Sequence, residues 1–160
     1  MGAKIMKRKI LKLGHKILRL YWRIFKPVTL GVRAIVIDEN NRILLVKHTY
    51  ENYWFLPGGG VKKGETFDQA IIRELREETG YEANTMELFG VYNNTYEGKR
   101  DTVVVFICKD GKLGEFSGSP EIEKHEFFNT NDLPENTSKG MRKRIEEFYG
   151  SSKSTHFGIW

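Results

Sequence analysis

The chain has 160 residues, of which 39% are apolar and 12% aromatic. This length corresponds to one domain, and so apolar a composition excludes an intrinsically disordered chain. The one cysteine, Cys108, excludes an internal disulfide and fits a reducing cytoplasm, and no apolar run reaches the roughly 18 residues that a spanning helix needs.

The formal net charge of +5 is distributed unevenly along the chain. Residues 1–26 hold nine Lys and Arg and no acid, which leaves 17 Lys and Arg against 21 Asp and Glu in the rest. A mildly acidic domain therefore follows a basic segment. The high pI of the whole chain does not indicate a domain that binds nucleic acid.

The basic segment has the period of an amphipathic helix. Apolar residues recur at three- and four-residue steps from Met6 to Ile24, and Pro27 ends the pattern. We expect a helix over residues 1–27 that docks on an anionic surface, with the inner face of the membrane as the candidate for a peripheral contact. The alternatives are that its apolar stripe packs on the protein's own sheet or on a second subunit of a homodimer, or that its cations bind RNA.

The remainder alternates between strand and helix patterns. The expected strands are Thr29–Ile37, Arg42–Lys47, Met86–Tyr96, Thr102–Lys109 and His125–Asn129, and the expected helices are Phe67–Thr79 and Lys139–Tyr149. This order predicts an α+β domain over residues 28–150, with a mixed sheet packed between helices. The Gly- and Ser-rich residues 151–160 are expected to form a mobile tail.

The helix expected at Phe67–Thr79 carries three acids on one face. Glu74, Glu77 and Glu78 stand at positions i, i+3 and i+4, where like charges destabilise a helix by about 0.2–0.5 kcal/mol per pair. A divalent cation would offset this repulsion, because hard cations take carboxylate oxygens. The alternative is a solvated acidic face, relieved by Arg73 and Arg76.

A glycine-rich loop precedes this helix and favours the first interpretation. Pro57 is followed by Gly58, Gly59 and Gly60, and glycines allow the backbone to approach a ligand closely. Thr66 can cap the helix, with Gln69 completing a capping box. Acids beside such a loop form the arrangement needed to hold Mg²⁺ against a diphosphate.

The stretch from Gly59 to Tyr81 resembles the signature of the Nudix hydrolases, G-x5-E-x7-R-E-U-x-E-E-x-G-U, where U is a bulky aliphatic residue. The matching residues are Gly59, Glu65, Arg73, Glu74, Leu75, Glu77, Glu78 and Gly80. Tyr81 at the last position is the one departure, and its bulk affects packing rather than chemistry. The likeness extends in layout from Thr29 to Tyr149 and implies an α/β/α Nudix fold. It does not cover the basic segment.

The resemblance implies a hydrolase that cleaves a diphosphate linkage with the help of Mg²⁺, for which Mn²⁺ could substitute. The implied metal ligands are Glu74, Glu78 and Glu77, a backbone carbonyl near Gly58 or Gly59, and Glu121 from a distal loop. Arg73 would orient the carboxylates and pair with Glu65. The general base stays open between the signature glutamates Glu77 and Glu78 and the distal Glu121 or Glu123.

Further residues are weaker candidates for substrate contacts. Arg33, Lys47 and Arg100 could meet phosphates, or be solvated cations. Tyr50, Tyr53 and Trp54 could stack on a base, although Trp54 is equally suited to the core.

The substrate stays open among nucleotide sugars, dinucleoside polyphosphates, nucleoside triphosphates and RNA 5′ ends. No proline lies between Pro57 and Pro120, where ADP-ribose hydrolases often carry one, and Tyr96 stands near but not at an offset seen for diadenosine polyphosphates. The rival functions are a non-catalytic nucleotide sensor on the same fold and a membrane- or RNA-docking module.

Overall fold

The computed structural model describes residues 28–94, 100–116, 118–150 and 155–160, together with Leu13, Gly14, Ile17, Leu20, Tyr21 and Ile24. The strands are β1 Val28–Val36, β2 Arg42–His48, β3 Trp54–Phe55, β4 Tyr81–Glu82, β5 Thr85–Asn94, β6 Arg100–Lys109, β7 Lys112–Leu113, β8 Ile122–Asn129 and β9 His156–Ile159. The helices are α2 Phe67–Thr79, the short 3₁₀ helix η2 Thr130–Asp132, and α3 Lys139–Gly150.

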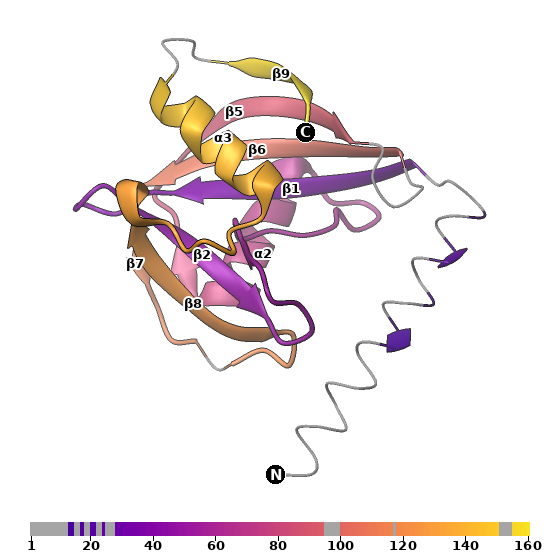
Figure 1. Cartoon of the computed structure of the whole chain (residues 1–160), viewed down its shortest axis with the longest axis horizontal. Helices are drawn as coiled ribbons and strands as arrows, with labels where there is room; N and C mark the ends of the chain where they lie inside the picture. Colours follow the sequence, from indigo (N-terminus) through magenta and orange to yellow (C-terminus); the bar gives the residue numbers. More distant parts are fainter. Residues whose placement is uncertain are drawn as a thin grey trace.

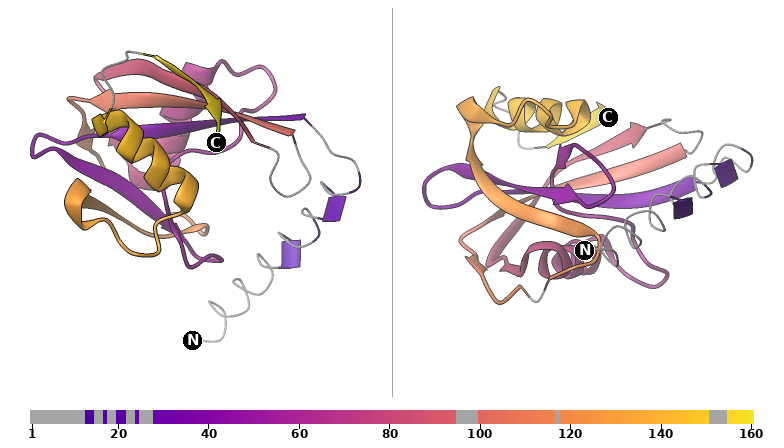
Figure 2. Two further views of the ribbon diagram at one scale, coloured as in Figure 1. Left: turned by 45° about the horizontal axis from the view of Figure 1, so that its top comes forward. Right: turned by 60° about the horizontal axis from the view of Figure 1, so that its bottom comes forward.

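The strands form three sheets. The largest has the order β1-β6-β5-β9, the second has the order β3-β2-β8, and β4 pairs with β7. In the largest sheet β1 runs parallel to β6, β5 runs antiparallel to β6, and β9 runs parallel to β5. Figure 1 shows these elements, and in the right-hand view of Figure 2 helices α2 and α3 lie on opposite sides of the strands. The predicted mixed sheet between helices is therefore confirmed.

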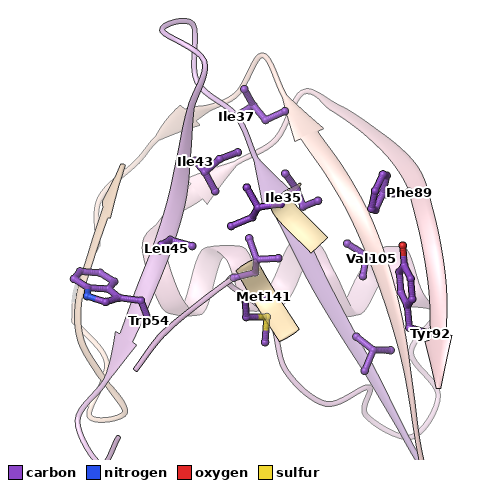
Figure 3. Packing of buried hydrophobic residues seen from close by; sticks show 12 residues of the cluster. Ile35, Ile37, Ile43, Leu45, Trp54, Phe89, Tyr92, Val105 and Met141 are labelled. Carbon is purple, nitrogen blue, oxygen red and sulfur yellow. The ribbon is translucent and has the colours of Figure 1, made fainter. Parts of the chain in front are cut away.

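The core consists of two apolar clusters, one against each helix. Side chains alternate along a strand, so on β1 Ile35 faces one cluster while Ala34 and Val36 face the other. Helix α3 contributes Met141 and Ile145 to the first cluster, which Figure 3 shows from close by. Helix α2 contributes Ala70, Ile71 and Leu75 to the second. Through this second cluster the core fixes the position of the acidic helix against the sheet.

Helix α2 has the bounds that its sequence predicts. The Thr66 side chain accepts a hydrogen bond from the Gln69 amide, and the Gln69 side chain accepts one from the Thr66 amide, which completes the capping box. The helix ends at Gly80, whose φ of 70° lies in the left-handed region where glycine is unstrained. Tyr81 is buried in the cluster beneath α2, so at this signature position it serves packing.

The C-terminal segment corrects the expectation of a mobile tail. His156–Ile159 form strand β9, which pairs in parallel with β5, and Trp160 donates its amide proton to the Asn93 carbonyl at 2.9 Å. The Trp160 ring packs on Tyr92, and His156 is buried with its Nδ1 3.0 Å from the Glu147 carboxylate. The Gly- and Ser-rich composition did not predict this strand, because its pairing partner β5 lies far away in the sequence.

Most of the predicted helix at residues 1–27 lies outside the described residues, as does Tyr96. The six upstream residues that are described, from Leu13 to Ile24, are all helical. Within the part of the chain that the structure describes, no helix has the length and hydropathy that crossing a membrane requires.

Candidate active site

The glycine loop is held along strand β1 by backbone hydrogen bonds. The Val32 amide donates to the Gly59 carbonyl and the Ala34 amide to the Pro57 carbonyl, each at 2.9 Å. Gly58 has a φ of 134°, and a Cβ there would lie 2.2 Å from the Val32 carbonyl oxygen. Only glycine fits this position, because both the conformation and the space exclude a side chain.

Glu78 of α2 extends beneath this loop. Its side chain is buried, and its Oε2 accepts a hydrogen bond from the Gly58 amide at 2.8 Å. Burial raises the pKa of the Glu78 carboxyl to about 8, while Arg33 and the Gly58 amide act in the opposite direction. The carboxylates of Glu74 and Glu121 raise the same pKa further. A buried acid among other acids is therefore costly to ionise unless a cation joins it.

Glu74 lies against the next glycine of the loop. A Cβ on Gly59 would stand 2.6 Å from the Glu74 Oε1, so an alanine there would displace the carboxylate. Arg73 Nη1 donates to the same Oε1 at 2.6 Å. The loop and α2 thus bring two of the predicted ligands, Glu74 and Glu78, to adjacent glycines.

Arg73 connects the helix to the segment that follows the loop. Its Nε and Nη2 donate to the two oxygens of Glu65 at 2.6 and 2.9 Å, and Nη2 also reaches the Gly60 carbonyl at 3.1 Å. These bonds lower the pKa of Glu65 to about 2, with the Arg73 side chain as the largest cause and the Lys62 amide as the next. The predicted Arg73–Glu65 pair is therefore present as a bidentate contact.

Glu77 occupies a different environment from its two neighbours. It is half-exposed and forms ion pairs with Arg73 at 3.2 Å and Lys62 at 3.7 Å. Of the three acids predicted to share a face, two lie under the loop, and the third faces these cations.

Arg33 has a contact that sequence reasoning missed. Its Nη1 donates to the Gly58 carbonyl and, at 3.1 Å, to the Leu56 carbonyl, so it supports the loop from β1. Nothing in the sequence around Arg33 marks this role, because it depends on the register between the loop and β1. Arg33 lowers and Glu121 raises the pKa of both Tyr50 and Glu78.

Tyr50 is largely buried, and this burial raises its pKa to about 12, with Glu121 as the next cause. Burial lowers the pKa of His125 on β8, while the Glu78 backbone acts on that pKa in the opposite direction. The charge of Glu78 thus acts on Tyr50, whereas His125 is influenced by the backbone of Glu78 rather than by its carboxyl.

The other substrate candidates are dispersed. Lys47 forms an ion pair with Glu123 at 3.4 Å, Arg100 is exposed at the start of β6, and Tyr53 is half-exposed. Trp54 is buried in the core against Phe128, which decides between the two interpretations of this residue in favour of packing. The structure thus brings Arg33, Tyr50 and Glu121 to the site.

The donor atoms at this site fit a hard divalent cation. Carboxylate and backbone carbonyl oxygens are the ligands that Mg²⁺ takes, and the space beside Gly59 that a Cβ would fill is bordered by the Glu74 carboxylate. Among the described residues, no three His, Cys, Asp or Glu side chains form a group that could hold a metal ion. Glu78 at Gly58 and Glu74 at Gly59, together with the loop carbonyls, are therefore the candidate donors.

Known proteins resemble this chain in sequence and in fold. The family model of the NUDIX domain matches residues 27–148. An ADP-ribose pyrophosphatase from Methanocaldococcus jannaschii is 34% identical over 83% of the chain and 76% of that relative. An RNA pyrophosphohydrolase from Orientia tsutsugamushi is 25% identical over 77% of the chain and 91% of that protein. The solved structure of a UDP-X diphosphatase is 29% identical with a TM-score of 0.67, covering 81% of the chain and 66% of that structure.

Proposed function

Because this chain belongs to the Nudix family of hydrolases, we propose that it cleaves a diphosphate linkage in a nucleoside diphosphate derivative. The observation that carries the proposal is the Glu78 carboxyl, buried beneath the Gly58 amide with the Glu74 carboxylate beside the next glycine. A solvated acidic helix face would leave these side chains in water. The non-catalytic sensor is disfavoured because every acid of the signature is retained.

Glu74, Glu78 and the carbonyl of Gly58 or Gly59 would hold the divalent cation, which we propose to be Mg²⁺ with Mn²⁺ as a substitute. When bound, such a cation neutralises phosphate charge and lowers the pKa of bound water. Arg73 donates a hydrogen bond to Glu74 and is itself anchored by its bonds to Glu65. Arg33 supports the glycine loop through its bond to the Leu56 carbonyl. The site residues are thereby oriented before a substrate arrives, which favours reaction from a fixed geometry.

The general base is proposed to be Glu78, with Glu77 and Glu121 as the alternatives. A base must lie within reach of the attacking water, and the Gly58 amide holds the Glu78 carboxyl at the glycine loop. Glu77 is half-exposed and paired with two cations, and Glu121 is exposed in its loop. Of the three, only Glu78 also borders the glycine loop.

We propose a nucleoside diphosphate linked to a sugar as the substrate class. The support is that one relative is named an ADP-ribose pyrophosphatase and a similar solved structure a UDP-X diphosphatase. The charges of Glu121 and Arg33 act on the Tyr50 pKa, and the Tyr50 ring is a surface on which a nucleobase could stack. The triphosphate end of RNA is the second candidate, since another relative is named an RNA pyrophosphohydrolase.

A product assay tests the proposal. The chain is incubated with ADP-ribose, UDP-sugars, nucleoside triphosphates and a 5′-triphosphorylated RNA, each with Mg²⁺, with Mn²⁺ or with EDTA, in water labelled with heavy oxygen. Cleavage within the diphosphate puts the label on a phosphate and requires the cation. Turnover in EDTA, or label on a sugar carbon, contradicts the proposed chemistry, and turnover of RNA alone shifts the substrate to the second candidate.

A further inference from the structure

Upstream of the catalytic domain, the described residues include a set of exposed apolar side chains. Leu13, Ile17, Leu20 and Ile24 are helical and between 60% and 64% exposed. They follow one another at three- and four-residue steps, the spacing that places side chains on one side of a helix. At this exposure the four described side chains are not buried against the protein's own sheet.

The charges of the same segment are of one sign. Residues 1–26 hold nine Lys and Arg without an acid, while residues 27–160 hold 17 Lys and Arg against 21 Asp and Glu. The segment is thus strongly cationic and the catalytic domain carries a net charge of −4. An anionic surface attracts the first and repels the second.

We propose that residues 1–26 dock the protein on the surface of an anionic phospholipid bilayer. An exposed apolar stripe takes up hydrocarbon at the headgroup boundary while Lys and Arg meet anionic headgroups. Tyr21 and Trp22 in the sequence suit that boundary, since one part of each ring is apolar and another polar. This inference concerns a segment outside the catalytic site and does not rest on the proposed diphosphatase activity.

Two other occupants fit the observations less well. RNA would use the cations through its phosphates but would leave the apolar stripe in water. A second copy of the chain could cover the stripe, but face-to-face contact would bring two segments of nine cations together. Only a bilayer of anionic lipid uses both the charge and the apolar residues.

Co-sedimentation of the full chain with vesicles tests the proposal. We expect binding to phosphatidylcholine mixed with phosphatidylglycerol, weaker binding as salt is raised, and no binding to phosphatidylcholine alone. Replacing Lys12, Lys16, Arg19 and Arg23 together by glutamate should weaken binding by at least about 10-fold, given what each cation contributes near such a surface. Ile17→Gln with Leu20→Gln should also weaken binding with every cation retained.

Matched controls use the catalytic domain. Glutamate at the exposed Lys109, Lys112, Lys139 and Lys143 changes the net charge by the same amount, and Phe157→Gln with Ile159→Gln removes two apolar side chains that are 91% and 78% exposed. Both controls should bind vesicles like the wild type.

Absence of binding to anionic vesicles, or equal losses in segment and control variants, overturns the proposal. Unchanged vesicle binding by the Ile17→Gln, Leu20→Gln variant overturns the insertion of the apolar stripe. Binding of a labelled RNA without binding to vesicles assigns the segment to RNA. A stable dimer in solution that forms through this segment assigns it to a second copy of the chain.

Discussion

The Glu78 carboxylate and the Gly58 amide are 2.8 Å apart, and their hydrogen bond joins the buried side of α2 to the glycine loop. The same Gly58 uses its carbonyl to accept a bond from Arg33 on β1. One glycine therefore connects an acid from the helix with a cation from the sheet. A change at any of these three residues should alter the geometry of the loop, and the predictions below use this dependence.

Glu78→Gln should lower turnover by about 10²–10⁴-fold, because the amide keeps the shape of the side chain but can neither carry charge nor take a proton. Turnover is measured with the best substrate of the panel in saturating Mg²⁺, and circular dichroism verifies the fold. Glu82→Gln is the matched control, since Glu82 is exposed on β4. Wild-type turnover by Glu78→Gln would remove this residue from the proposed mechanism.

The stability of the metal-free protein should fall as pH rises from about 4.5 to about 8. The pKa of Glu78 is raised from 4.5 to about 8, so the folded state holds a proton that the unfolded state has already lost. Stability is then greatest below the unfolded pKa, and the loss is complete above the folded one, on the order of a few kcal/mol.

Urea unfolding in EDTA across this pH range measures the effect. The difference in unfolding free energy between the wild type and Glu78→Gln isolates this carboxyl from other groups that titrate. The glutamine variant should be the more stable of the two at pH 8, with a smaller advantage at pH 5. A difference that does not vary with pH would contradict the buried, protonated state of Glu78.

Gly59→Ala should lower turnover by about 10²-fold, since its methyl group would lie 2.6 Å from the Glu74 Oε1 and push the carboxylate away. Gly60→Ala provides a close control, because a Cβ on Gly60 meets no atom within 4 Å. Both variants are assayed for kcat and KM at several Mg²⁺ concentrations. Equal activity of the two would show that Glu74 relaxes without consequence.

Trp160→Ala should destabilise the domain by about 1–3 kcal/mol while kcat stays unchanged. The ring packs on Tyr92, lies 5.7 Å from the buried Arg144 guanidinium, and covers Gly140. Phe157→Ala, which removes a ring that is 91% exposed, should stay within about 0.5 kcal/mol of the wild type. Thermal unfolding of both variants distinguishes a packed terminus from a mobile one.

Local signals predicted the acidic helix because its ends are specified by neighbouring residues. Thr66 and Gln69 cap one end and Gly80 stops the other, and both interactions span only a few residues. The pairing of Arg73 with Glu65 follows equally from a short separation along the chain. Apolar alternation located the long strands β1, β2, β5 and β6 to within a few residues of their observed ends.

The tertiary structure decided what depends on distant partners. Strand β9 exists because β5 offers it an open edge, and its own Gly- and Ser-rich surroundings carry no strand pattern. Glu78 became the buried acid and Glu77 the half-exposed one because the packing of α2 on the sheet turned the first toward Gly58 and the second toward Lys62. Arg33 supports the loop only through the register of β1 against Pro57–Gly59. The sequence by itself thus specified the acidic helix, the glycine loop and the residues proposed to carry the chemistry. Burial and strand pairing, which bring together residues far apart along the chain, decided how each one is placed.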